Sequence, residues 1–216
     1  MRRVLLLTAA ATAALSLAAC QKKAEGNAVV AEGNAASSTM STANPGQTGP
    51  VNAAQNAASA VVGQTSAATV GAHDTGAFVD NVTQANMYEI KAAQIAQQKA
   101  TSPEVKAFAK MMVTDHTAMA NELKPLITKA GKTPAAALDQ RRQGLLDNLG
   151  AASAKDFDKA YIDQQVAGHD ETLTLVKGYA DNGGDAGLKA AAGKAAPKVQ
   201  AHLDKAKAIQ AKLASG

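Results

Sequence analysis

The sequence predicts an all-α protein, an antiparallel four-helix bundle with an extra short helix in the crossover at 131–152. Two observations support this fold class. From Phe78 onward, apolar residues recur three and four positions apart, which is the period of an amphipathic helix. No stretch shows the alternation of apolar and polar residues that is typical of a strand. Long helical segments of this kind bury their apolar faces by packing together as a bundle.

The individual helices are placed by their start and stop signals. Ser102 followed by Pro103 is typical of a helix start, with serine as the cap and proline in the first turn. Ser153 with Asp156 three residues later resembles a capping box, and Gly183 marks the end of the helix that follows. The predicted ranges are 76–100, 102–130, 134–149, 153–180 and 185–213, of which 134–149 is the short helix of the crossover.

The N-terminus has the pattern of an export signal. Arg2 and Arg3 precede an apolar run over 4–17. This run is shorter than the ~20 residues that a membrane-spanning helix needs. It ends in Leu17-Ala18-Ala19-Cys20, which resembles the processing box of bacterial lipoproteins, and Cys20 is the one cysteine of the sequence.

We therefore predict a lipoprotein signal peptide at 1–19 and a lipid anchor on Cys20. In enterobacterial lipoproteins, an aspartate after the cysteine retains the protein in the inner membrane. Gln21 stands there in this chain, so we expect an outer-membrane lipoprotein that faces the periplasm. The alternative is an ordinary signal peptide followed by a chance cysteine.

The segment 20–75 is predicted to be a disordered tether that begins with the lipidated cysteine. Residues 21–75 contain no Leu, Ile, Phe, Tyr or Trp, so they can bury too little apolar surface to offset the entropy of ordering. A coil of this length would span ~40 Å and lift a domain off a membrane. A frayed helix near 53–62 is the alternative. The folded domain is predicted over 76–216.

The composition excludes several classes of function. The chain has 22 basic residues, two of them in the predicted signal peptide, against 18 acidic residues, and it has no tryptophan. It contains no long basic run, so nucleic-acid binding has no support. Neither a nucleophile elbow nor a phosphate-binding loop stands out, which favours a protein that is not an enzyme.

Each of the four main predicted helices carries one ionisable residue near the centre of its apolar face. At 100° per residue, Glu89, His116, His169 and His202 are all flanked by apolar side chains. Glu89 and His116 each lie ~20 Å along the helix from the turn that joins their helices. His169 and His202 lie ~21 and ~28 Å from the turn between theirs. The members of each pair should meet at similar heights, whereas the alignment of the two hairpins depends on the crossover at 131–152.

One carboxylate and three imidazoles in the middle of a bundle form a potential ligand set. A buried carboxylate is costly unless it is paired or bound to a metal. Three neutral imidazoles with a carboxylate suit zinc, copper, iron or nickel. We predict that Glu89, His116, His169 and His202 bind a single transition metal ion or a small polar ligand.

Three further polar residues are expected to hydrogen-bond around this set. Asp115 lies beside His116 at a helix interface, and Tyr161 and Gln165 flank the face that carries His169. The alternative is a buried Glu–His network that holds no ligand, in a structural or interaction protein of the envelope. A metal site should lose its ion below pH ~6, when imidazoles become protonated, whereas such a network should tolerate that pH.

A set of short motifs across the predicted bundle resembles one known family of bacterial envelope proteins. The motifs are Phe78, Glu89, Gln94-Ile95-Ala96, 102–109, 112–116, Phe157-Asp158, Tyr161, His169, Pro197 and His202-Leu203. The family is catalogued as domain of unknown function 4142, and the resemblance covers about 76–213. It implies a ferritin-like four-helix bundle that is exported to the envelope, and it implies no established activity.

The ferritin-like resemblance raises the question of a di-iron site. Such a site needs a glutamate from each of two helices and a Glu-x-x-His motif from each of the other two. In this chain valine stands three residues before each of the three histidines, at Val113, Val166 and Val199. A ferritin-like redox enzyme is therefore only the third interpretation, after the binding protein and the structural protein.

Overall fold

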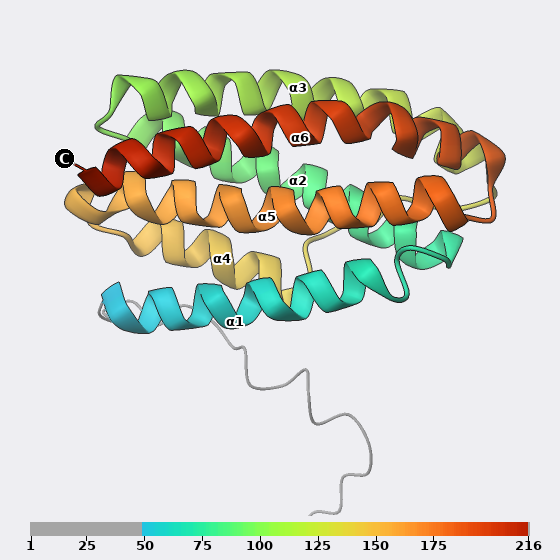
Figure 1. The fold of residues 1–216 in the computed structure, drawn as a ribbon, viewed down its shortest axis with the longest axis horizontal. Coiled ribbons are helices and arrows are strands. Elements are labelled where there is room, and N and C mark those ends of the chain that lie inside the picture. The colour runs from blue at the N-terminus through green and yellow to red at the C-terminus, as the bar shows by residue number, and fades with distance from the viewer. Residues whose placement is uncertain (1–48, 216) are drawn as a thin grey trace, which may run out of the picture. The chain divides into compact units, whose positions relative to one another are not determined.

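A computed structural model describes residues 49–215 and the side chains of 54–215. The described part is helical without strands, as Figure 1 shows. Its helices are α1 (Gly49–Ala68), α2 (Thr75–Lys99), α3 (Pro103–Lys129), α4 (Gln140–Ala151), α5 (Ala154–Asn182) and α6 (Ala186–Ser215). The prediction of an all-α bundle is confirmed. No helix among the described residues is long and apolar enough to cross a membrane.

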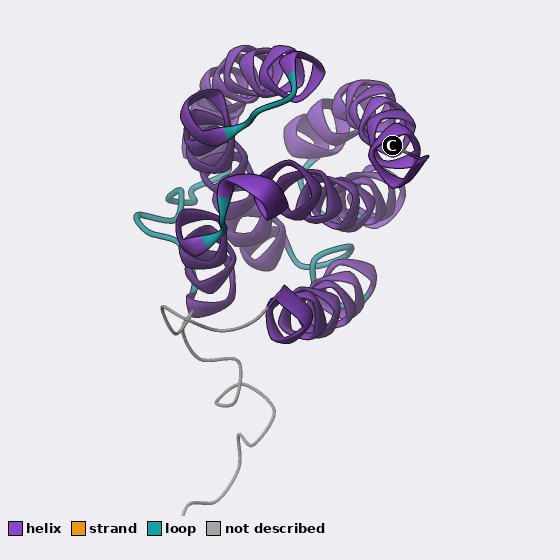
Figure 2. Cartoon of the chain, turned by 90° about the vertical axis from the view of Figure 1, so that its left-hand side faces the viewer, coloured by secondary structure: helices purple, strands orange, loops and turns teal. Residues whose placement is uncertain are grey.

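Four long helices form the bundle. α2 and α6 each pack on both α3 and α5, so the order around the ring is α2, α3, α6, α5. Figure 2 shows the bundle nearly end-on. The loop 131–139 and α4 carry the chain back along the bundle before α5 begins. The carboxylate of Asp158, near the start of α5, accepts hydrogen bonds from the backbone N–H of Thr101 at 3.0 Å and of Ser102 at 2.8 Å. The start of α5 therefore lies beside the turn between α2 and α3.

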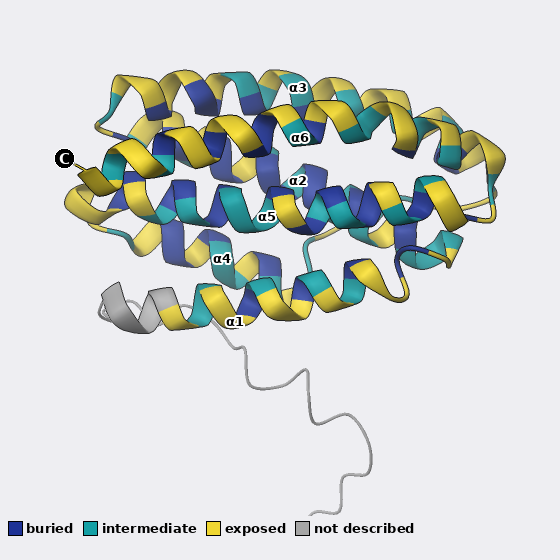
Figure 3. Ribbon diagram, viewed as in Figure 1, coloured by how far each residue is buried: buried dark blue, intermediate teal, exposed yellow. Residues whose placement is uncertain are grey.

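The apolar core lies along the inner faces of these helices, which Figure 3 shows as stripes of buried residues. At the end where α5 begins, the core is centred on Phe108, Phe157 and Tyr161. At the other end, Phe78 stacks on Tyr179 with ring centroids 3.8 Å apart. The four predicted ligands lie between these two apolar clusters, whereas Tyr161 belongs to the first of them.

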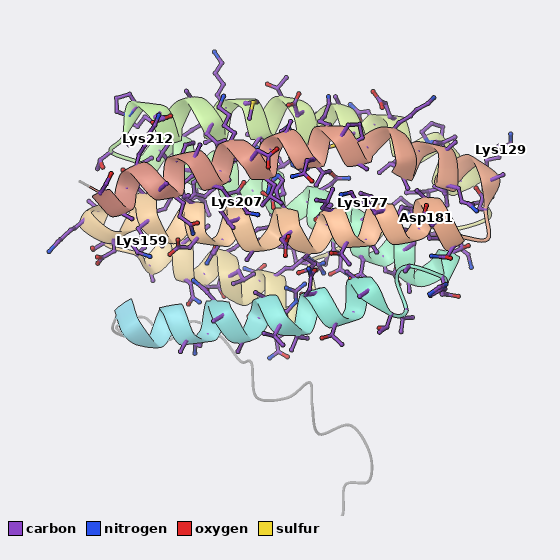
Figure 4. The ribbon with its side chains drawn as sticks, viewed as in Figure 1. Lys129, Lys159, Lys177, Asp181, Lys207 and Lys212 are labelled. Atoms are coloured by element: carbon purple, nitrogen blue, oxygen red, sulfur yellow. The ribbon has the colours of Figure 1, made fainter. Side chains whose placement is uncertain are left out.

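Most lysines of α3, α5 and α6 lie on the outside of the bundle. The residues labelled in Figure 4 are all exposed and belong to α3, α5 and α6: Lys129, Lys159, Lys177, Asp181, Lys207 and Lys212. The polar residues of the interior therefore need a separate explanation.

Helix caps confirm two of the predicted starts and correct a third. The side chains of Ser102 and Ser153 cap α3 and α5 as expected. The short helix α4 begins at Gln140 and not at 134, because Asp139 provides the capping side chain, which accepts from the N–H of Arg142 at 2.7 Å. The loop before it is attached to α2, since Gln84 accepts the backbone N–H of Asp139 at 2.6 Å.

The prediction of a disordered tether was wrong for residues 49–75. Helix α1 spans Gly49–Ala68 and packs along α5. Small residues permit this contact: a Cβ placed on Gly63 would lie 1.8 Å from the Glu171 carboxylate, and Ala67 is 1% exposed. The alternative of a helix near 53–62 was closer to the structure. The predicted signal peptide, the lipid anchor on Cys20 and the tether up to residue 48 lie outside the described residues.

Candidate functional site

The structure brings three of the four predicted site residues together. His116 of α3, His169 of α5 and His202 of α6 are each 1–2% exposed. Their ring centroids are 5.4–5.5 Å apart, and one ring nitrogen from each lies within 4.8 Å of the corresponding nitrogens of the other two. We call these three residues the histidine cluster.

Each imidazole of the cluster uses one ring nitrogen to bond an oxygen acceptor outside the cluster. The pairs are His116 Nδ1 with Asn86 Oδ1 at 2.9 Å, His169 Nδ1 with the Gln165 carbonyl at 2.8 Å, and His202 Nε2 with Asp115 Oδ2 at 2.8 Å. An oxygen acceptor places the proton on the nitrogen that faces it. The opposite nitrogen of each ring is therefore left with its lone pair.

The three remaining nitrogens are buried and have no hydrogen-bond partner among the described residues. They are His116 Nε2, His169 Nε2 and His202 Nδ1. Leaving a buried polar atom without a partner costs about 1–3 kcal/mol, so a ligand that bonded all three nitrogens would stabilise the folded protein. Neutral imidazole nitrogens with free lone pairs are the donors that transition metal ions bind. The residues present therefore fit a metal ion.

Glu89, the fourth predicted ligand, is buried but lies on the other side of His169. Its Oε1 is 3.9 Å from His169 Nδ1, whose proton is already donated to the Gln165 carbonyl. The Gln165 side chain donates to Glu89 Oε2 at 2.5 Å. Helix α2 packs on α3 and α5 and carries Glu89 against the flank of α5, so the carboxylate does not join the three free nitrogens.

The three residues predicted to surround the site have different positions. Asp115 accepts from His202, in the carboxylate–histidine arrangement that orients many metal ligands. Gln165 links the histidine cluster to Glu89, because its carbonyl accepts from His169 and its side chain donates to the Glu89 carboxyl. Tyr161 packs against aromatic rings of the core, and its buried hydroxyl has no partner in the described chain.

Asn86 is a site residue that the sequence reasoning missed. Its side-chain oxygen holds the Nδ1 proton of His116, and the residue is 6% exposed. The available signal was its position one helical turn before Glu89, which places both side chains on the same face of α2.

Burial keeps the imidazoles of the cluster uncharged at neutral pH. Desolvation, with the neighbouring imidazoles, holds the pKa of His116 well below its ordinary value of 6.5. Desolvation also lowers the pKa of His169 to about 4, although the hydrogen bond to Gln165 opposes this. The pKa of His202 is lowered by burial against the opposing effect of Asp115. Because the unfolded chain takes up protons on these histidines before the folded protein does, the stability that the neutral imidazoles contribute is present above pH 6.5. It is lost as the pH falls toward the lowered pKa values.

Burial has the opposite consequence for Glu89. Desolvation raises the pKa of its carboxyl from 4.5 to about 8, although the bond from Gln165 acts to lower it. At neutral pH the folded protein therefore holds a protonated Glu89, whereas the unfolded chain would ionise it. The stability that this group contributes is present below pH 4.5 and is lost as the pH rises toward 8.

Comparison with known proteins agrees with the resemblance found in the sequence. The model of the family described as "Domain of unknown function (DUF4142)" matches residues 59–209. The chain belongs to this family. Among curated proteins, none matches the chain in sequence.

Two solved structures have a similar fold. One is "CopM in the Cu(II)-bound form", with a TM-score of 0.56 and 20% sequence identity, covering 65% of this chain and 97% of that chain. The other is "CopM in the Ag-bound form (by co-crystallization)", with a TM-score of 0.54 and 23% identity, covering 64% and 96%. At this level of identity the likeness establishes the shared helical fold of this DUF4142 protein.

Proposed function

We propose that this protein is an envelope lipoprotein whose helical bundle binds a single transition metal ion through His116, His169 and His202. The observation that supports this most strongly is the set of three buried nitrogens, one on each ring, that have no partner among the described residues. Each ring is oriented by an acceptor on its other nitrogen, so the donor set is already formed before a metal arrives.

Copper is the metal that this donor set fits best. Three neutral imidazoles suit copper or zinc, and copper stands highest among the divalent metals in affinity for such ligands. Iron sites commonly add a carboxylate to two histidines, and Glu89 lies outside the three-nitrogen group. The structures with a similar fold were determined with Cu(II) and with Ag bound, which favours copper in this chain as well. Zinc with a water as fourth ligand is the runner-up.

The competing interpretation is a structural protein in which the same residues form a network without a ligand. The Glu89–Gln165–His169 contacts favour such a network on one side of the cluster. A network selected for structure should satisfy its buried atoms with one another. The three ring nitrogens without a partner are all acceptors, so they cannot hydrogen-bond among themselves.

Metal content tests the proposal. The full chain carrying Cys20→Ser would be exported to a periplasm, purified without chelators and analysed by elemental mass spectrometry. The matched variants are His169→Leu and, as a control, His73→Leu, because His73 is exposed and lies outside the cluster. We expect near-stoichiometric copper in the parent and the control, and little in His169→Leu. A parent that is empty and takes up neither copper nor zinc would refute the metal function.

The anchor is tested separately. We propose that Cys20 carries the lipid and holds the bundle at the outer membrane, facing the periplasm. Cells that express the full chain would be labelled with a radioactive fatty acid and fractionated. Label on the parent in the outer-membrane fraction, and none on Cys20→Ser, is the expected result. An unlabelled parent would contradict the lipid anchor and favour an ordinary signal peptide on a secreted protein.

A further inference from the structure

A cavity of about 240 Å³ lies between α1, α2, α4 and α5, on the side of Glu89 that faces away from the histidine cluster. Alanines at several lining positions leave space beside larger side chains such as Tyr88 and Gln164. The apolar walls of the cavity are formed mainly by Ala57, Ala60, Ala85, Leu145 and Ala167. The volume corresponds to the space of roughly eight water molecules, or one small ring compound.

The inner end of this cavity carries a hydrogen-bonding group. Glu89 lines it and is 2% exposed. Its Oε2 accepts from Gln165, whereas its Oε1 receives no hydrogen bond from any described residue. Gly168 leaves room for this oxygen, since a Cβ at that position would lie 3.0 Å from it. A ligand in the cavity would therefore meet one free carboxyl oxygen at the bottom.

The fixed charges that line the cavity are already paired: Asp163 with Lys159 at the surface, and the others within one network. Arg141 and Arg142 both bond the carboxylate of Glu171, at 2.7 and 2.8 Å. Arg142 also bonds Asp139, at 2.5 Å. The guanidinium groups and Glu171 are largely buried, with side-chain exposures of 6–14%. A charged ligand would find no unpaired counter-charge here, and burying it would be costly.

We propose that this cavity binds a small uncharged ring compound that carries one hydroxyl group, with the ring against the alanine-lined walls and the hydroxyl hydrogen-bonded to Glu89. Mainly apolar walls with a few polar groups, here Glu89 at the base and side chains such as Asn56 and Thr172 elsewhere in the lining, are the usual form of a small-molecule site. The cavity is smaller than the sites that hold drug-sized ligands, which restricts the occupant to a single ring.

The site depends on α1, which forms one wall through Ala57 and Ala60. Ala60→Leu would fill the cavity from this wall. Ala58→Leu is the matched control, because Ala58 is on the same helix, is exposed and does not line the cavity. Glu89→Leu removes the carboxyl that the hydroxyl would bond.

The test is an NMR titration of the metal-free full chain carrying Cys20→Ser, with phenol as the neutral probe. Benzoate and benzylamine serve as charged probes of similar size. We expect saturable phenol binding with a Kd of about 1 mM or tighter, and binding at least tenfold weaker for both charged probes. Ala60→Leu and Glu89→Leu should each weaken phenol binding at least tenfold, and Ala58→Leu should not.

Several results would overturn the proposal. They are the absence of saturable phenol binding, equal binding of a charged probe, or unchanged binding in Ala60→Leu. If Ala60→Leu fails to fold, Glu89→Leu decides the question, since unchanged phenol binding in that variant would contradict the assigned contact. Because the titration is made without metal, its outcome is separate from that of the metal proposal.

Discussion

Replacing His169 with leucine separates a metal site from a structural network. In the metal-free protein, the change removes the donation from Nδ1 to the Gln165 carbonyl, but that carbonyl still accepts the backbone N–H of residue 169 within α5. It also removes the buried Nε2 that has no partner in the described chain. Glu89 keeps its bond from Gln165. Since an unsatisfied buried atom costs about 1–3 kcal/mol, the metal-free variant should be at least as stable as the parent.

With copper bound, the parent should be more stable than His169→Leu. A ligand at about a thousand times its Kd stabilises a folded protein by about 4 kcal/mol. For a domain of this size, each kcal/mol raises Tm by about 2–4 °C, so copper should raise the parent's Tm by about 8–16 °C. His169→Leu retains two imidazoles and should gain little. His73→Leu, on the surface, should respond like the parent.

The assay is thermal and urea unfolding followed by circular dichroism, with and without copper. A metal-free His169→Leu that is less stable than the parent by about 3–5 kcal/mol would show that the imidazole is part of a structural network, because removing one partner of a buried charged pair costs this much. A variant that keeps the full copper-induced shift would show that His169 is not a ligand. Either result would refute the reasoning.

Three further changes test other parts of the site and fold. Asp115→Asn replaces the carboxylate that bonds His202 Nε2 with a neutral amide, a weaker acceptor that holds the ring and its proton less firmly; copper affinity measured by chelator competition should fall about 10–100-fold. The raised pKa of Glu89 predicts that the free energy of unfolding decreases between pH 6.5 and 8, and urea titrations of Glu89→Gln should lose this dependence. Gly63→Ala places a Cβ 1.8 Å from the paired Glu171 carboxylate; it should destabilise the docking of α1 by about 1–3 kcal/mol and speed proteolysis within α1, leaving copper content unchanged.

The sequence was sufficient to turn the three histidines toward the core, but not to bring them together. Helical periodicity turns His116, His169 and His202 inward, and counting residues from the turn gives His169 and His202 similar heights. Whether His116 meets this pair depends on how the crossover at 131–152 aligns the two hairpins, and the structure supplies that alignment. The sequence does not show how far a side chain reaches across the bundle, because that depends on which helices are neighbours. Glu89 was assigned as a ligand for that reason, although α2 packs against α3 and α5 and presents it to the far side of His169.

Helix α1 was expected only as an alternative, a frayed helix near 53–62, because none of its described side chains is at once large, apolar and buried. The arguments that identify helices from sequence rely on stripes of large apolar side chains. In α1 the contact with α5 is made instead by Gly63 and Ala67, whose small size lets the two backbones approach closely. The start of α4 was placed too early because a proline after threonine resembles a helix start, whereas Asp139, the residue that caps α4, lies five positions after Pro134.

The positions of the histidines in the chain would make a bound ion a cross-link between distant segments. They belong to three different helices and lie 53 positions (116 to 169) and 33 positions (169 to 202) apart. One ion bound to all three would close two long loops of the chain, as a pair of disulfide bridges would. The chain has a single cysteine and can form no internal disulfide. A bound ion would therefore act as its one cross-link, and a chelator could open that link without any change in redox conditions.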